Sequence, residues 1–291
     1  MTAVYKKELR SYFCNPVGYV FIGLLLCVVG VCARLFNLKS GGYPQFEYAI
    51  SGSGAGLIYI LLIPILTMRS LSEERRQKTD QLLFALPIGS ADVVLGKFFA
   101  MSTVLAIPTG VMCLYPLILH LYGDVNFAGA YCSILMFYLL GVALTALCMF
   151  LSSLTESQLI AAVTGAAAVL LIFMLDTVAG LLPATALASV MGYLVLILLF
   201  SALVYRLLSD LNLSIIVALA LSVVLLAVYL LQPNAFLGSF ASLLRSFALF
   251  SLLDNGIYGS MFDLTTVVMY LSVTAAFLFF SVRVLEKRRW N

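Results

Sequence analysis

Long apolar runs constrain this chain more than any other feature of its sequence. They are continuous rather than alternating, and several approach or exceed the roughly 20 residues that an α-helix needs to cross a bilayer. The chain is 63% hydrophobic and 10% charged, whereas soluble domains carry about 25% charged residues. We therefore predict an all-α polytopic membrane protein, and the unbroken runs exclude a β-barrel.

Eight runs are predicted to span the membrane as one domain, residues 1–291. They are Val17–Ala33, Ala55–Met68, Val93–Leu121, Ala128–Leu154, Ser157–Leu175, Leu187–Tyr205, Leu213–Leu231 and Leu264–Val282. With the N-terminus in the cytoplasm, only Arg34, Lys39 and Arg245 of the sixteen basic residues fall on the outer side. Basic residues concentrate on the cytoplasmic side, so we predict that both termini are cytoplasmic.

The first fifteen residues are predicted to form an amphipathic helix. Apolar and basic side chains alternate there at near-helical spacing, among them Tyr5, Lys6, Leu9, Arg10 and Tyr12. Such a helix would lie flat on the inner leaflet, with its basic groups at the anionic lipid headgroups. The dipeptide Asn15-Pro16 would end it before the first span. A generic basic flank is the alternative interpretation.

Two of the predicted outer segments are too long to be simple turns. Residues 37–54 are rich in glycine, and residues 232–263 carry phenylalanine and leucine at roughly helical spacing. The second segment is expected to form one or two short helices at the extracytoplasmic membrane interface. It is interpreted either as surface helices packed on the spans or as a substrate gate.

A charged island, Arg69–Lys97, separates the second and third spans. Ser70 and Glu73 fit the capping-box pattern of a helix start, and Pro87 would end the helix. The sequence therefore predicts a short cytoplasmic helix over residues 70–86 that forms a docking surface. A solvated loop without a partner is the alternative.

The island also carries a recognisable signature. Glu74-Arg75-x-x-x-Thr79-Asp80-x-Leu82-Leu83-x-x-x-Pro87, followed by Ile88, Ser90 and Gly96-Lys97, resembles the motif of ABC-2-type exporter permeases. The N-terminal K-E-L-R-x-Y-F-x-N-P-x-G-Y and the C-terminal L-E-x-R-R-W resemble the gliding-motility (GldF-like) branch of that family. Lys78 departs from the pattern, because the family usually has glycine at this position.

This resemblance implies specific partners. Residues 70–86 would be a coupling helix seated in a separate ABC ATPase subunit, and residues 1–15 would be the elbow helix. Two permease chains, in the simplest case a homodimer, would act with two ATPase subunits that bind ATP-Mg. The residues implied to seat the ATPase are Glu73, Glu74, Arg75, Thr79, Asp80, Leu82, Leu83 and Pro87.

The chain itself is predicted to carry no catalytic, cofactor or metal site, and no nucleic-acid partner is expected. Ionisable side chains are almost missing from the span centres, which argues against an ion-driven carrier or an intramembrane hydrolase. The sequence around Gly96-Lys97 is not a phosphate-binding loop, because Ala91 and Phe98 replace its required glycine and hydroxyl residue.

Small residues in the fifth span would let a neighbouring helix approach closely. The resemblance suggests that Gly165, Ala166 and Ala168 line a dimer interface or the central pathway. Plain packing within one subunit is an equal alternative.

The sequence thus predicts a membrane-spanning permease subunit of an ATP-driven ABC exporter, located in a bacterial cytoplasmic membrane. The alternative is a mechanotransmitting subunit that acts on an extracytoplasmic accessory partner without translocating substrate. Lipids, peptides, polysaccharides and drugs all stay open as substrates.

Overall fold

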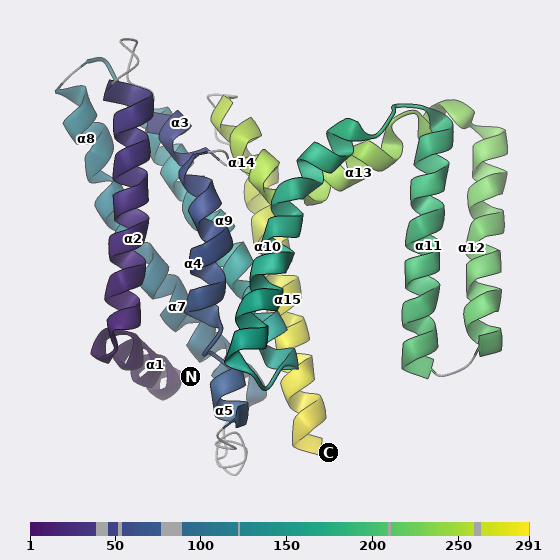
Figure 1. The fold of residues 1–291 in the computed structure, drawn as a ribbon, viewed down its shortest axis with the longest axis horizontal. Helices are drawn as coiled ribbons and strands as arrows, with labels where there is room; N and C mark the ends of the chain where they lie inside the picture. The colour runs from purple at the N-terminus through teal and green to yellow at the C-terminus, as the bar shows by residue number, and fades with distance from the viewer. Residues whose placement is uncertain are drawn as a thin grey trace. The chain divides into compact units, whose positions relative to one another are not determined.

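The protein is described by a computed structural model that covers residues 1–38, 46–51, 54–76, 89–121, 123–208, 211–258 and 263–290. These residues form helices and no strand (Figure 1). The α-helices are α1 Thr2–Cys14, α2 Pro16–Ala33, α3 Phe46–Ile50, α4 Ile58–Thr67, α5 Ser72–Arg76, α7 Ser90–Met112, α8 Leu114–His120, α9 Phe127–Leu154, α10 Gln158–Leu181, α11 Ala186–Leu208, α12 Leu211–Leu231, α13 Ser239–Phe247, α14 Leu249–Tyr258 and α15 Leu264–Trp290.

The prediction of an all-helical membrane protein is confirmed. Among the described residues, 6 helical segments are long and apolar enough to cross a bilayer, and two shorter apolar helices accompany them. The six segments are Pro16–Phe36, Phe46–Arg76, Ser90–His120, Phe127–Leu154, Gln158–Leu181 and Leu264–Arg288. The shorter two, Ala186–Ala202 and Ile215–Leu231, belong to α11 and α12 and correspond to the sixth and seventh predicted spans.

The second span begins earlier than predicted. Phe46–Ile50 was expected in an outer connection, but Phe46, Ala49 and Ile50 are fully buried. Phe46 stacks on Tyr115 with the ring centroids 5.6 Å apart. An apolar helical turn thus precedes the Gly/Ser segment, and burial of its aromatic ring favours packing over exposure.

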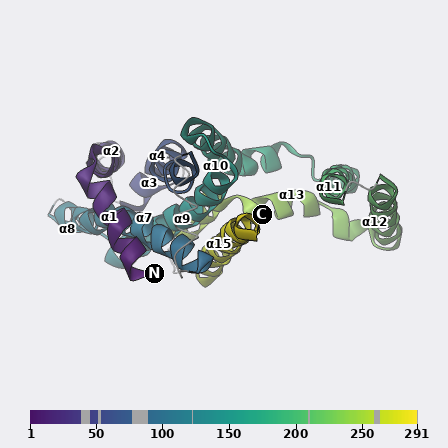
Figure 2. The same ribbon diagram turned by 90° about the horizontal axis from the view of Figure 1, so that it is seen from below.

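The chain divides into two compact units, one comprising residues Met1–Phe173 and Leu249–Asn291 and the other Met174–Ala248. In the first unit, α9 packs against α4, α7, α14 and α15. Figure 2 shows α4, α7 and α15 around α9. The Tyr59 ring stacks on Phe137 at 4.3 Å, and its hydroxyl donates to the Phe137 carbonyl at 3.2 Å. A buried tyrosine therefore packs its ring and satisfies its hydroxyl in the same contact.

The second unit is built around the helix pair α11 and α12, with α13 packed on α11. Aromatic side chains join these elements, because Tyr193 contacts both Phe236 and Phe240 edge to face. Arg245 also forms an ion pair with Asp176 at 3.7 Å. The short helices predicted within residues 232–263 are present, with α13 in the second unit and α14 in the first.

A sharp elbow joins α1 to α2. Asn15 is extended, with φ −98° and ψ 151°, and Pro16 occupies the first turn of α2, where its missing N–H costs nothing. Gly18 lies buried against α1, and a Cβ atom at this position would come within 2.6 Å of the Tyr12 carbonyl oxygen. Because that oxygen belongs to the backbone, a larger residue can fit only if α1 moves.

We predict that Gly18→Ala lowers stability by about 1–3 kcal/mol through overpacking at the elbow. The measurement is the melting temperature in detergent, followed by size-exclusion chromatography after heating. Gly23→Ala on the same helix is the control, because nothing lies within 4 Å of its Cβ position. Equal melting temperatures for the two variants would show that the elbow is not tightly packed.

Candidate functional site

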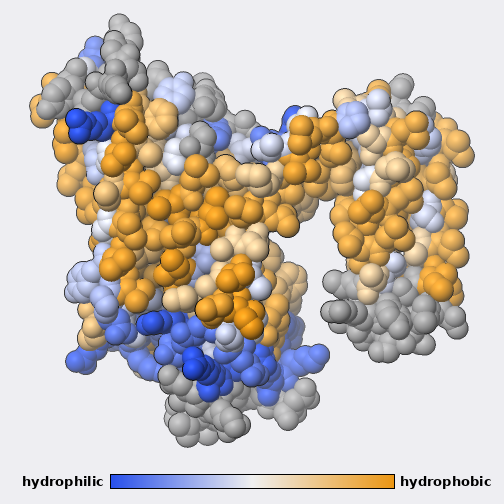
Figure 3. Space-filling view, viewed as in Figure 1, coloured by the Kyte–Doolittle hydropathy of each residue, from blue (hydrophilic) through white to orange (hydrophobic). Residues whose placement is uncertain are grey.

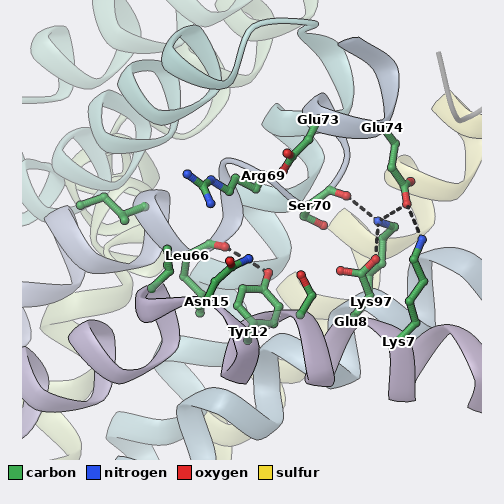
Figure 4. Close-up of a pocket in the computed structure, with 13 residues that line it drawn as sticks. Lys7, Glu8, Tyr12, Asn15, Leu66, Arg69, Ser70, Glu73, Glu74 and Lys97 are labelled. Atoms are coloured by element: carbon green, nitrogen blue, oxygen red, sulfur yellow. Dashed lines mark hydrogen bonds and ion pairs between the residues drawn. The ribbon is translucent and has the colours of Figure 1, made fainter. Parts of the chain in front are cut away.

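Hydrophilic side chains gather at one end of the first unit, where α1 and α5 lie (Figure 3). The centre of this region is Lys97, whose side chain is only 2% exposed. Its Nζ lies 2.8 Å from Glu74 Oε1 and 3.1 Å from Glu8 Oε1, and it donates to the Ser70 carbonyl at 2.6 Å (Figure 4). A buried ammonium group is tolerated when it is paired and hydrogen-bonded in this way.

The Lys97 cluster joins three elements. Glu8 belongs to α1, Glu74 to α5 and Lys97 to α7. Helices α1 and α7 pack closely enough for these side chains to meet, since a Cβ atom at Gly96 of α7 would lie only 3.1 Å from Val4 Cβ of α1. Lys7 adds a longer ion pair to Glu74 at 3.9 Å. The start of the charged island is therefore fixed to the elbow helix and to the third span.

Helix α5 is also tied to the end of α9. Arg75 forms an ion pair with Glu156 at 2.8 Å and donates to the Leu154 carbonyl at 3.0 Å. Glu156 is 69% exposed, so the ion pair itself adds little stability. The backbone N–H of Ser72 donates to Ser152 Oγ at 3.3 Å.

The last helix reaches the same place. Arg288 of α15 donates to the carbonyl of Ser153, which lies in the final turn of α9. The α9 terminus therefore carries contacts from both α5 and α15. Since the last carbonyls of a helix have no partner within the helix, these donors satisfy groups that would otherwise need water.

The predicted capping box is not formed. The buried Ser70 hydroxyl has no hydrogen-bond partner among the described residues, and α5 begins at Ser72. The Ser70 backbone is held by Lys97 instead, through its carbonyl. A tertiary contact has thus replaced the local one that the pattern predicts.

Only part of the predicted coupling helix falls within the described residues. Ser72–Arg76 is helical, with Glu73 and Glu74 in its first turn as expected from the helix dipole. Thr79, Asp80, Leu82, Leu83 and Pro87 lie outside the described residues. The docking role of these side chains stays a prediction, and Glu74 has the intramolecular partners given above.

The residues predicted for the elbow helix divide between two faces. Tyr5 shares a hydrogen bond with Thr103 at 3.0 Å, and the Tyr12 hydroxyl donates to the Leu66 carbonyl at 3.2 Å. Leu9 packs against the core, while Lys6 and Arg10 are exposed. Desolvation, aided by Glu8, raises the pKa of Tyr12, so its hydroxyl stays protonated and able to donate.

The small residues of α10 do not share one environment. Gly165 is buried, with its Cβ position 3.3 Å from Pro64 and 3.5 Å from Cys148 Sγ. Ala168 packs against the core, and Ala166 is half-buried. Gly165 thus has partners within its own chain, and the predicted dimer or pathway role stays a prediction.

Sequence reasoning missed the pairing of Lys97 with Glu8. Lys97 is the last residue of the charged island, and α7 begins about two turns before it, at Ser90. A lysine that far inside an apolar helix needs a counter-charge, so the sequence position of Lys97 could have pointed to an acidic partner.

The described residues also contain no group of three or more His, Cys, Asp or Glu side chains suited to a metal.

Comparison with protein families matches residues 33–182 to the ABC-2 family transporter proteins. The match covers just over half of the chain. The chain belongs to the ABC-2 transporter family. A search of the curated proteins found no match. Members of this family are membrane subunits that are typically not catalytic, and membership implies an ATPase partner. The matched part of this ABC-2 protein includes α5 and Lys97.

We predict that Lys97→Met destabilises this ABC-2 protein by about 3 kcal/mol or more, because two partly buried carboxylates lose their partner. The measurement is the melting temperature in detergent, compared with Lys6→Met on the exposed face of α1. Adding Glu8→Gln and Glu74→Gln to Lys97→Met should restore much of the loss. A Lys97→Met protein as stable as Lys6→Met would contradict the structural role of the cluster.

Proposed function

We propose that this chain is the membrane-spanning permease subunit of an ATP-driven exporter, with ATP-Mg bound and hydrolysed by a separate ABC ATPase subunit. The observation that carries the proposal is the three-way attachment of α5. Its Glu74 is paired with Lys97 of α7, its Arg75 contacts the α9 terminus, and Lys97 also binds Glu8 of α1.

This attachment supports a mechanical role for the island. A force applied to Ser72–Arg76 would be transmitted through short polar contacts to α1, α7 and α9 together. A solvated loop without a partner needs no such anchoring. The coupling helix over residues 70–86 would receive the movement of the ATPase subunits, and the anchors would pass it to the spans.

The assembly follows from the proposed role. Two permease chains, as a homodimer, would stand above two ATPase subunits in a bacterial cytoplasmic membrane, with both termini cytoplasmic. The basic residues at the α1 and α5 end agree with this orientation. The apolar faces of the spans favour a hydrophobic or amphipathic substrate over a small ion.

Membership of the gliding-motility branch rests on the two chain ends, K-E-L-R-x-Y-F-x-N-P-x-G-Y and L-E-x-R-R-W. Both lie outside the matched residues 33–182. The branch assignment is therefore a finer proposal than the family.

A second candidate function is force transmission to an extracytoplasmic accessory subunit without substrate transport. The observation that favours it is the second unit, in which the amphipathic helix α13 has no buried residue and leaves Phe247 55% exposed. Such a surface suits a protein partner or a membrane interface. An accessory subunit that co-purifies with the complex, and is lost on Phe247→Asp, would favour this function.

For the leading proposal, we predict that an ATPase subunit co-purifies with the native chain from detergent-solubilised membranes and that Leu83→Asp abolishes this. A buried charge in a docking groove is expected to weaken binding more than tenfold. The control is Leu121→Asp, because Leu121 is 81% exposed and follows α8 at the far end of the third span. Size-exclusion chromatography verifies that both variants are folded.

Two results would contradict the proposal. One is a native chain that brings down no ATPase, and the other is a Leu83→Asp variant that retains the ATPase as well as Leu121→Asp does. Glu74 is not used for this test, because its substitution would also break the pair with Lys97.

A further inference from the structure

A cavity of about 310 Å³ lies between α1, the end of α4, α5 and α7. Figure 4 shows its polar lining, with Lys7, Glu8 and Tyr12 on one side and Arg69, Glu73 and Glu74 on the other. These side chains occupy the charged end of the spans, where a bilayer meets water. The cavity is far larger than the roughly 30 Å³ that one water molecule occupies, so it can hold a headgroup-sized ligand.

An apolar groove of about 180 Å³ continues from this cavity along α2 and α4. The groove and the cavity share Val17, Ile65 and Leu66. From Pro16 to Leu24 the groove follows about 12 Å of α2, at 1.5 Å per residue. The two compartments therefore form one site with a polar end and an apolar tail, which is the division found in a phospholipid.

The charges in the polar compartment are balanced. Its ionisable lining consists of three bases and three acids, namely Lys7, Arg69, Lys97, Glu8, Glu73 and Glu74. Lys97 is already paired with Glu8 and Glu74. Arg69 is exposed and makes no hydrogen bond or ion pair among the described residues, and its guanidinium points away from the Lys97 cluster in Figure 4.

We propose that this two-part cavity binds a phosphatidylethanolamine molecule from the leaflet at this end of the spans. Arg69 would bind the phosphate, because a guanidinium group donates two parallel hydrogen bonds to phosphate oxygens. The carboxylates of the lining would accept hydrogen bonds from the primary ammonium group, and one acyl chain would occupy the α2–α4 groove.

The balance of charge selects this headgroup. Because the bases and acids of the lining already balance, a purely anionic headgroup would add a negative charge that no base is left to compensate. A choline headgroup carries a cation, but its trimethylated nitrogen has no N–H to donate. The ethanolamine headgroup carries both the phosphate and the N–H donors.

The lipid site goes beyond the proposed transport function and does not depend on an ATPase partner. Its test is lipid binding to the purified chain, measured by native mass spectrometry in detergent. The probes are phosphatidylethanolamine, phosphatidylcholine and phosphatidylglycerol with identical acyl chains. We expect one phosphatidylethanolamine to bind about tenfold more tightly than either of the others. Equal affinities, or a preference for phosphatidylglycerol, would overturn the proposal.

Two matched pairs of variants locate the site. Arg69→Gln should reduce phosphatidylethanolamine binding about tenfold, whereas Arg10→Gln, which removes an exposed charge from α1 outside the cavity, should leave it unchanged. Val20→Trp should block the groove, and Val31→Trp on the same helix should not, since Val20 and Val31 are 56% and 52% exposed. Equal binding within either pair would place the lipid elsewhere.

Discussion

The pairing of one buried lysine with two carboxylates organises the charged end of this protein. Lys97 draws together Glu8, 89 residues away, and Glu74, and it also holds the backbone of Ser70. Desolvating an ammonium group is costly, and the cost is offset only if all three partners are in place at once. The relative positions of α1, α5 and α7 at this end are therefore interdependent, and none of them can shift alone without exposing or orphaning a charge.

This interdependence fixes the position of a short helical segment against the rest of the first unit. The described part of helix α5 is Ser72–Arg76. Its position is set by Lys97 on one side and by the α9 terminus on the other, where Arg75 and Ser72 bind. Since α9 is the helix that α4, α7, α14 and α15 pack against, a contact at its terminus reaches the centre of the first unit.

The sequence alone was sufficient for the features that depend on local pattern. Continuous apolar runs located the spans, and Asn15-Pro16 located the end of α1, because both act through neighbouring residues. The burial of Phe46, Ala49 and Ile50 could not be predicted, since a single helical turn with apolar side chains fits an interface as well as a core. The partners of Lys97 and the unused Ser70 hydroxyl depend on helices distant in sequence, which periodicity does not report.

The first compact unit is discontinuous in sequence, because residues Met174–Ala248 are inserted between its two parts. Helix α15 completes this unit along α9, and its Tyr270 is fully buried with its hydroxyl donating to the Leu249 carbonyl at 2.8 Å. The ribosome must therefore synthesise the whole second unit before α15 exists and can cover α9. Until then the side of α9 that α15 covers lacks its partner, so a chain truncated after the second unit would leave the apolar side chains of this α9 face without the contacts that complete the first unit.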